Sequence, residues 1–477
     1  MGNAPKSSTL RNLVLRGTTY LTVRQALSIG IGIVGVVVLT RQIGPSAYGR
    51  YVGSLAIVTF LTAVTRIGID TYVIRRPEEP DARTYRVAFT VMLVNGCATF
   101  ILGALLAPDT LGRLIGESFV RPFQVLLVAL PLSLLLAPGL ASLERELRYR
   151  RVALVELANT LVFYAVAVPL AFAAPGVWAP VVGYLAAQAF SLVATLAVSR
   201  VPVGLAWSRI EVREIVRFGL PLTLAAACNE GRRLVNPIVV GGLLGPAAVG
   251  VVGLALRIAE MLRFVSAAGY RVSVSVLSRL LGDAGRLSRA VSEGMFLQIL
   301  GVAPFFAGFA VVSGWIIPAV LGDRWEETVT VFPLIAAASL LFAFMSLQSS
   351  LLYVAGRGTD VLLANVASLA LLAAGAAAAT RLSDSPAAYG AGELVSVAGL
   401  WFVHRAAARF VSIDYRAMAP WLAASIAPLF FTWVGLPWGL LLLLPALALL
   451  SRRTARARFG PYVRHLLPGR GDSSADD

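Results

Sequence analysis

Two short stretches of the chain, RQIGPSAYGRY at residues 41–51 and GLLGPAAVGVV at residues 242–252, carry the same pattern of glycine, proline and alanine. Each stretch joins two long apolar segments, and about six such segments separate the copies. Two copies in the same orientation predict parallel repeats related by an axis along the membrane normal, with a substrate site between the halves. The matched positions are Gly44 with Gly245, Pro45 with Pro246, Ala47 with Ala248, Gly49 with Gly250 and, further along, Gly68 with Gly269.

The composition identifies an integral membrane protein. Hydrophobic residues make up 58% and charged residues 14% of the 477 residues, whereas a soluble protein carries about 25% charged residues. The mean hydropathy is +0.79. Apolar runs of about twenty residues recur along the chain, each long enough to cross a hydrocarbon layer about 30 Å thick. The first run lacks the short core and cleavage site of a secretory signal, so we expect an uncleaved span.

The apolar runs predict an all-α integral membrane protein with about fourteen transmembrane helices. We expect two six-helix bundles, related as parallel repeats, and two further helices at the C-terminus. The predicted spans are 18–40, 50–69, 87–107, 122–141, 152–173, 177–198, 218–242, 248–268, 294–317, 329–354, 361–380, 389–409, 417–434 and 436–451. The predicted parts are a tail (1–17), a first bundle (18–199), a second bundle (200–410), two extra helices (411–451) and a basic, then acidic tail (452–477).

The arginines predict the orientation in the membrane. They gather in the two tails and in the connections that follow even-numbered spans, which places almost all of the net charge of +16 on one side. The positive-inside rule assigns that side to the cytoplasm, so both termini are expected there. The basicity is therefore a topology signal and a contact for anionic lipids of the cytoplasmic face, rather than a sign of nucleic-acid binding.

Residues 226–242, AACNEGRRLVNPIVVGG, place polar groups in the middle of a predicted span. On a helix with about 100° per residue, Asn229, Arg232, Arg233 and Asn236 fall within an arc of about 100°, and Glu230 lies at its edge. Polar groups at that depth are costly, so such a stripe is expected to face a cavity or another polar stripe. Pro237 follows the stripe and is expected to kink the helix.

Two other spans carry charged residues at helical spacing. Arg257, Glu260 and Arg263 recur every three residues in span 8, and Arg66 and Asp70 lie four residues apart near the end of span 2. One interpretation is that these residues only form ion pairs along their own helices: Glu230 with Arg233, Arg257 with Glu260 and Arg66 with Asp70. The other interpretation gives the arginines a substrate. The residues themselves leave both open.

Four stretches resemble a known family. LTRQIGPSAYGRYVGSLAIVTFLTAVTRIGIDTYVIRR at 39–76 resembles the N-terminal signature of the polysaccharide-transporter, or O-antigen flippase-like oligosaccharide flippase, family of the multidrug/oligosaccharidyl-lipid/polysaccharide superfamily. IVRFGLPLTLAAACNEGRRLVNPIVVGGLLGPAAVGVVGLALRIAEML at 215–262 is similar to the opening of the family's second half. VLGDRWEETVTVFPLIAAASLL at 320–341 and SLLYVAGRGTDVLLANV at 350–366 resemble its segments around span ten. The resemblance runs from about residue 10 to residue 450.

This resemblance implies a flippase that moves undecaprenyl-pyrophosphate-linked oligosaccharide across the cytoplasmic (inner) membrane by alternating access. The product would serve the synthesis of lipopolysaccharide (O-antigen), capsule or exopolysaccharide, with a polysaccharide polymerase and chain-length proteins as further partners. Because arginine stays charged and pairs bidentately with phosphate, an arginine-lined cavity would carry the pyrophosphate. The substrate-binding candidates are Arg232, Arg233, Arg257, Asn229, Asn236 and Arg66.

Coupling to a cation would need a carboxylate that titrates between states, for which Glu230, Glu260 and Glu393 are the candidates. Sugar recognition would depend on scattered polar groups such as Asn95, Asn159, Gln188, Asn229 and Gln298.

Two other functions compete with the flippase. A multidrug antiporter coupled to cations would have a cavity lined by acids and aromatic residues, whereas this chain offers at least as many arginines as acids in its spans. A membrane polysaccharide polymerase or ligase would need a sizeable outer loop with catalytic residues, and the longest outer connections, 108–121 and 318–328, are short. Cys97, Cys228, His404 and His465 are scattered, so we expect no metal site, no cofactor and no enzymatic activity.

Overall fold

The computed structural model describes residues 7–263 and 276–451, and all regular secondary structure in these two ranges is helical. Within them, nine helices are long and apolar enough to cross a membrane. The prediction of an all-α integral membrane protein is thereby confirmed. The number of fourteen spans stays a prediction.

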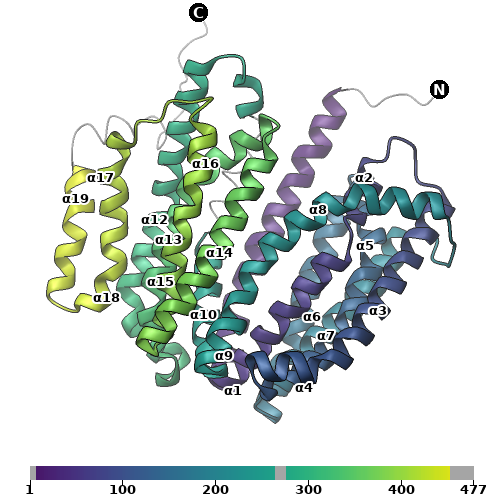
Figure 1. The fold of residues 1–477 in the computed structure, drawn as a ribbon, viewed down its shortest axis with the longest axis horizontal. Helices are drawn as coiled ribbons and strands as arrows, with labels where there is room; N and C mark the ends of the chain where they lie inside the picture. Colours follow the sequence, from purple (N-terminus) through teal and green to yellow (C-terminus); the bar gives the residue numbers. More distant parts are fainter. Residues whose placement is uncertain (1–6, 264–275, 452–477) are drawn as a thin grey trace, which may run out of the picture.

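The first half of the chain forms the helices α1 to α7, drawn in purple and blue in Figure 1. Arg145 at the end of α5 fixes the end of α2, because its guanidinium donates hydrogen bonds to the carbonyl oxygens of Val73 (2.7 Å), Arg76 (2.8 Å) and Glu78 (3.0 Å). These bonds satisfy carbonyls that a helix end leaves without partners. The helices are α1 (Ser7–Thr65), α2 (Ile69–Arg75), α3 (Ala82–Ile115), α4 (Val120–Leu126), α5 (Ala129–Arg145), α6 (Tyr149–Ala173) and α7 (Trp178–Ser199).

The loop between α2 and α3 ends in a helix cap. The Asp81 carboxylate accepts a hydrogen bond of 2.7 Å from the backbone N–H of Thr84. This hydrogen bond holds the pKa of that carboxyl below its usual value. An aspartate at this position satisfies one of the free N–H groups of the first turn, which is why α3 begins at Ala82.

The second half of the chain forms α8 to α16, followed by a shorter C-terminal group. The first of these helices changes to a π-helical turn, η2, at the polar stripe that the sequence singled out. The elements are α8 (Arg209–Val235), η2 (Asn236–Val240), α9 (Gly241–Leu244), α10 (Pro246–Leu262), α12 (Ala284–Leu321), α13 (Glu327–Val354), α14 (Gly358–Ser383), α15 (Ala387–Ser396) and α16 (Leu400–Ala407). The C-terminal group consists of α17 (Tyr415–Ile426), α18 (Phe431–Val434) and α19 (Leu444–Ser451).

The two glycine-proline stretches form equivalent elbows that contact each other. Gly44 (φ 72°, ψ 172°) breaks α1 between the predicted spans 18–40 and 50–69, and Gly245 (φ 83°, ψ −176°) separates α9 from α10, so both adopt a backbone conformation that favours glycine. A Cβ on Gly49 would overlap the carbonyl oxygen of Pro246, and a Cβ on Gly250 would overlap that of Pro45. This reciprocal contact is what two parallel repeats facing each other across an axis produce.

The two halves meet along α1, which packs against α8 and α10. Figure 1 shows α3 to α7 on one side of this seam and α12 to α16 on the other, with α17 to α19 at the outer edge beside α12. The start of α1 and the end of α19 lie at the same end of the molecule (Figure 1).

Most predicted spans correspond to a helix that extends beyond them at one or both ends. The span expected from residue 18 belongs to a helix that already begins at Ser7, within the predicted tail. The last part of the span predicted at 248–268 and Gly269, expected to match Gly68, lie outside the described residues, as does the tail 452–477. The boundaries of the predicted tails, bundles and extra helices, at residues 17, 199, 410 and 451, stay predictions.

Candidate functional site

A cavity of about 560 Å³ lies between the two halves of the chain. Helices α1 and α6 form one wall, and α8, α10, α13, α14 and α15 form the other. Its volume falls within the range of about 300–1,000 Å³ that is typical of small-molecule sites. The sequence-predicted residues on its lining are Asn229, Arg232, Arg233, Asn236, Arg257, Glu260 and Glu393.

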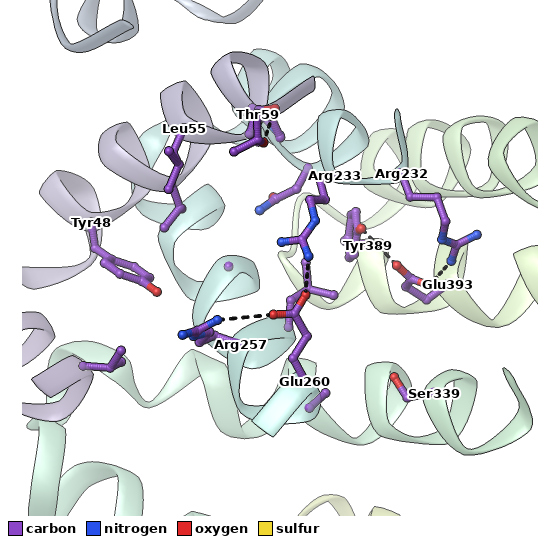
Figure 2. Close-up of a pocket in the computed structure, with 18 of the residues that line it drawn as sticks. Tyr48, Leu55, Thr59, Arg232, Arg233, Arg257, Glu260, Ser339, Tyr389 and Glu393 are labelled. Carbon is purple, nitrogen blue, oxygen red and sulfur yellow. Dashed lines mark hydrogen bonds and ion pairs between the residues drawn. The ribbon is translucent and has the colours of Figure 1, made fainter. Parts of the chain in front are cut away.

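Glu260 of α10 connects arginines of two helices. Its Oε1 lies 3.0 Å from Nη2 of Arg233 on α8, and its Oε2 lies 3.6 Å from Nη1 of Arg257 on its own helix. Figure 2 shows these two ion pairs side by side in the cavity. The side chains of Arg233 and Arg257 are 55% and 46% exposed, so each guanidinium keeps an open face.

Arg232 occupies a more enclosed position on the same wall. Its Nη2 lies 2.7 Å from Oε2 of Glu393 on α15, whose side chain is only 10% exposed. The Tyr389 hydroxyl donates a hydrogen bond of 3.0 Å to the other oxygen of Glu393, and the Arg232 guanidinium lies 4.7 Å from the centre of the Phe342 ring. Arg232 is thus fixed by a buried acid, whereas Arg233 and Arg257 share a half-exposed one (Figure 2).

The π-helical turn begins at Asn236. Proline at 237 has no N–H to donate to the carbonyl four residues earlier, which removes one α-helical hydrogen bond and accounts for the widened turn. Such turns are frequent at functional sites. The Asn236 amide donates to the carbonyl of Val249 (3.1 Å), while its Oδ1 has no hydrogen-bond partner among the described residues. The kink expected at Pro237 therefore takes the form of a π turn.

Arg66 and Glu230 are not among the residues that line this cavity. Arg66 follows the end of α1 and forms an ion pair of 3.1 Å with Asp70. Glu230 lies behind Arg233 and contacts its Nε at 3.2 Å. All three ion pairs that the spacing predicts are present, and of their three arginines Arg233 and Arg257 also line the cavity. The interpretation that gives the arginines a substrate stays a prediction.

The sequence did not single out the aromatic residues of the opposite wall or the polar side chain of Asn365. Tyr48, Tyr51, Phe163 and Tyr164 line the cavity from α1 and α6. Tyr48 and Tyr51 lie inside the motif quoted at 39–76, which was a usable signal. Nothing in the sequence separates Phe163 and Tyr164 from aromatic residues that face lipid.

The lining carries four arginines, including Arg263, against two glutamates. Glu230, behind the lining, adds a third acid. The cavity therefore has an excess of positive charge, and the guanidinium groups of Arg232, Arg233 and Arg257 line one shared space. Such an arrangement binds anions with several oxygens, phosphates above all.

Sequence comparisons connect the chain to polysaccharide synthesis. Residues 38–330 match the model of a family described as "polysaccharide biosynthesis protein". The chain is 24% identical over 344 residues to the lipopolysaccharide biosynthesis protein WzxC of Escherichia coli K12, covering 70% of this chain and 68% of that protein. It is 20% identical over 325 residues to the succinoglycan biosynthesis transport protein ExoT of Rhizobium meliloti 1021, covering 68% and 65%.

Comparison with solved structures shows the fold. The lipid II flippase MurJ, in an inward closed conformation, superposes with a TM-score of 0.73 at 12% identity, over 94% of this chain and 100% of that one. An inward-facing multidrug resistance transporter of the MATE family, a member of the MOP superfamily, superposes with a TM-score of 0.62 at 16% identity, over 83% and 98%. MOP is the superfamily that the sequence motifs resemble. The chain therefore belongs to the polysaccharide biosynthesis protein family, and it is a multi-pass membrane protein with the fold of the MurJ and MATE transporters.

Proposed function

We propose that this protein moves undecaprenyl-pyrophosphate-linked oligosaccharide from the inner to the outer leaflet of the cytoplasmic membrane, by alternating access through the cavity between its halves. The observation that carries this proposal is the excess of arginine over glutamate on the cavity lining. A diphosphate brings two or more negative charges into a layer without bulk water, and guanidinium groups compensate for them. The polyprenyl chain stays in the lipid.

Arg233 and Arg257 are the two residues to which we assign the diphosphate. Both guanidinium groups are about half exposed in the cavity, and both contact the same carboxylate, Glu260. The Glu260 carboxylate offsets part of their charge, because arginines left unpaired at this depth are unfavourable. The diphosphate would compete with Glu260 for both guanidinium groups.

Arg232 and Glu393 serve a different role in this proposal. Their ion pair of 2.7 Å is the more buried one, and Tyr389 and Ser396 add hydrogen bonds to it. We assign to this group the cohesion of α8 with α15, and Glu393 remains a candidate for cation coupling together with Glu260. Asn229 and Asn236 would contact the phosphate or the first sugar.

The proposal includes an orientation. Both termini face the cytoplasm, as the positive-inside rule predicts, and the basic face contacts anionic lipids there. A polysaccharide polymerase and chain-length proteins would act on the translocated product at the outer face.

The test is lipid transfer in liposomes that contain the purified full chain. Undecaprenyl-pyrophosphate-oligosaccharide is placed in both leaflets, and an impermeant glycosidase in the outside buffer measures how much becomes accessible. We expect nearly complete cleavage with the protein and cleavage of about the outer half without it. Half cleavage in both cases, together with proton- or sodium-driven export of ethidium from the same liposomes, would replace the flippase by the antiporter.

A further inference from the structure

The two walls of the cavity differ in chemistry. Every charged side chain on the lining comes from the second half of the chain, on α8, α10 and α15 or, for Arg263, directly after α10. The lining from the first half, on α1 and α6, contains aliphatic and aromatic side chains and one threonine, Thr59. A site that bound only an anion would not need an aromatic wall opposite the charged one.

The aromatic residues of the first wall form a continuous run. The Tyr48 and Tyr51 rings lie 6.5 Å apart, Tyr51 stacks on Phe163 at 6.4 Å with an interplanar angle of 25°, and Phe163 meets Tyr164 edge-on at 4.8 Å. The Tyr164 hydroxyl donates to the carbonyl of Gly32 (3.2 Å), which fixes its ring. Tyr48 and Tyr51 are only 5% and 6% exposed and back the partly exposed rings of Phe163 and Tyr164, which offer the larger ring surface to the cavity. Figure 2 shows the Tyr48 hydroxyl directed toward the side of the cavity that holds Arg257.

Arg257 is the point where the two walls meet. Its guanidinium pairs with Glu260 on the charged wall, and it lines the cavity together with Tyr48 and Tyr164 of the aromatic wall, with the Tyr48 hydroxyl directed toward its side (Figure 2). A phosphate held by Arg257 would therefore have the rings beside it. In a glycosyl diphosphate, the first sugar is joined to the phosphate through a single oxygen atom.

We propose that the aromatic run Tyr48, Tyr51, Phe163 and Tyr164 is a sugar-binding subsite for the pyranose ring attached directly to the diphosphate. This inference rests on the proposed function of the cavity. The C–H groups of one pyranose face pack against the partly exposed rings of Phe163 and Tyr164, whose negative quadrupole favours them. The tyrosine hydroxyls act as donors or acceptors for the sugar hydroxyls at the ring edge.

The prenyl chain is a poorer occupant of this wall. Lipid tails are as apolar as the protein side chains, so a prenyl chain gains little by moving from the bilayer onto the rings. It also has no group for the tyrosine hydroxyls. A sugar, by contrast, must leave water and needs both an apolar surface and hydrogen-bond partners.

The test compares two soluble probes with the purified full chain by titration calorimetry. One probe is a ten-carbon prenyl diphosphate, and the other is the same prenyl diphosphate carrying one glucose residue. Phe163→Leu removes a ring from the middle of the run, and Phe172→Leu is the matched control, since it makes the same change on the exposed face of α6. Tyr51→Phe, which keeps the ring and removes only the hydroxyl, is the second variant if Phe163→Leu does not fold.

We expect the native chain to bind the glucosylated probe more tightly than the sugar-free probe. Phe163→Leu should reduce that gain by roughly two- to tenfold, the range for one aromatic contact, and leave the affinity for the sugar-free probe unchanged. Phe172→Leu should change neither. Tyr51→Phe should lose only part of the gain.

Two results would overturn the inference in distinguishable ways. Binding of both probes with equal affinity by the native chain, or an equal loss for both in Phe163→Leu, removes the sugar subsite and leaves the arginine cavity intact. Binding of neither probe removes the proposed function and the inference with it.

Discussion

Glu260 illustrates at the scale of single residues how the cavity balances its charges. It contacts Arg233 and Arg257, whereas Glu230 contacts Arg233 from outside the lining. We predict that Glu260→Gln raises the affinity of the purified protein for inorganic pyrophosphate by about fivefold, because a competing ion pair worth about 1 kcal/mol is removed. Titration calorimetry at neutral pH measures this change.

Glu230→Gln is the matched control for that experiment. It removes the same charge beside the same arginine but leaves Glu260 in place, so we expect a gain of less than about twofold. Equal gains in the two variants would mean that only net charge matters and that Glu260 does not occupy the anion position.

The sequence predicted the stripe of Asn229, Arg232, Arg233 and Asn236 because residues three and four apart share a helix face, and all four line the cavity. It also predicted the ion pairs within helices. It could not predict that Arg232 pairs with Glu393, since these residues are 161 positions apart in the sequence. Contacts between helices depend on packing that no local spacing encodes.

The elbows at Gly44 and Gly245 show how closely the helices of the two repeats pack against each other. Gly49 and Gly250 each lie against a backbone carbonyl of the other repeat, and backbone cannot move aside as a side chain does. We predict that Gly250→Ala lowers the stability of the protein by about 1–3 kcal/mol through overpacking, visible as a lower thermal unfolding temperature in detergent.

Gly308→Ala on α12 serves as the control for the elbow. A Cβ at Gly308 meets no atom within 4 Å, so this substitution should be neutral or stabilise by up to about 1 kcal/mol through helix propensity. A Gly250→Ala protein as stable as Gly308→Ala would contradict the close contact between the repeats.

The repeat could be predicted from the sequence, because matching glycines and prolines at a fixed offset are recognised without knowing how the helices pack. The contact between Gly49 and Pro246 could not be predicted, because a repeat in the sequence does not show whether its two copies touch in the fold. Phe163 and Tyr164 of the aromatic wall were missed for a related reason: in a chain that is 58% hydrophobic, aromatic residues in a span carry no mark of the side they face.

The whole molecule has an orientation that the charges predict. Glu79, between α2 and α3, and Ser383, at the end of α14, are both exposed. The predicted orientation places Glu79 on the cytoplasmic side of the membrane and Ser383 on the outer side. In a background with Cys97→Ser and Cys228→Ser, an impermeant maleimide added to intact spheroplasts should label Ser383→Cys. It should label Glu79→Cys only after permeabilisation. The reverse pattern would invert the topology, and labelling of both from one side would contradict the number of spans between them.

We propose that the arginines of the cavity carry the anionic part of the substrate across the membrane. Lipid transfer in liposomes is compared between the double variants Arg233→Gln/Arg257→Gln and Arg213→Gln/Arg217→Gln. Both double variants remove two positive charges. Arg233 and Arg257 line the cavity, whereas Arg213 and Arg217 are exposed on the first part of α8. We expect the first variant to lose at least about tenfold in transfer rate, since each lost charged hydrogen bond costs about 1.5–3 kcal/mol, and the second to transfer at the native rate. Equal rates in the two folded variants would contradict the account.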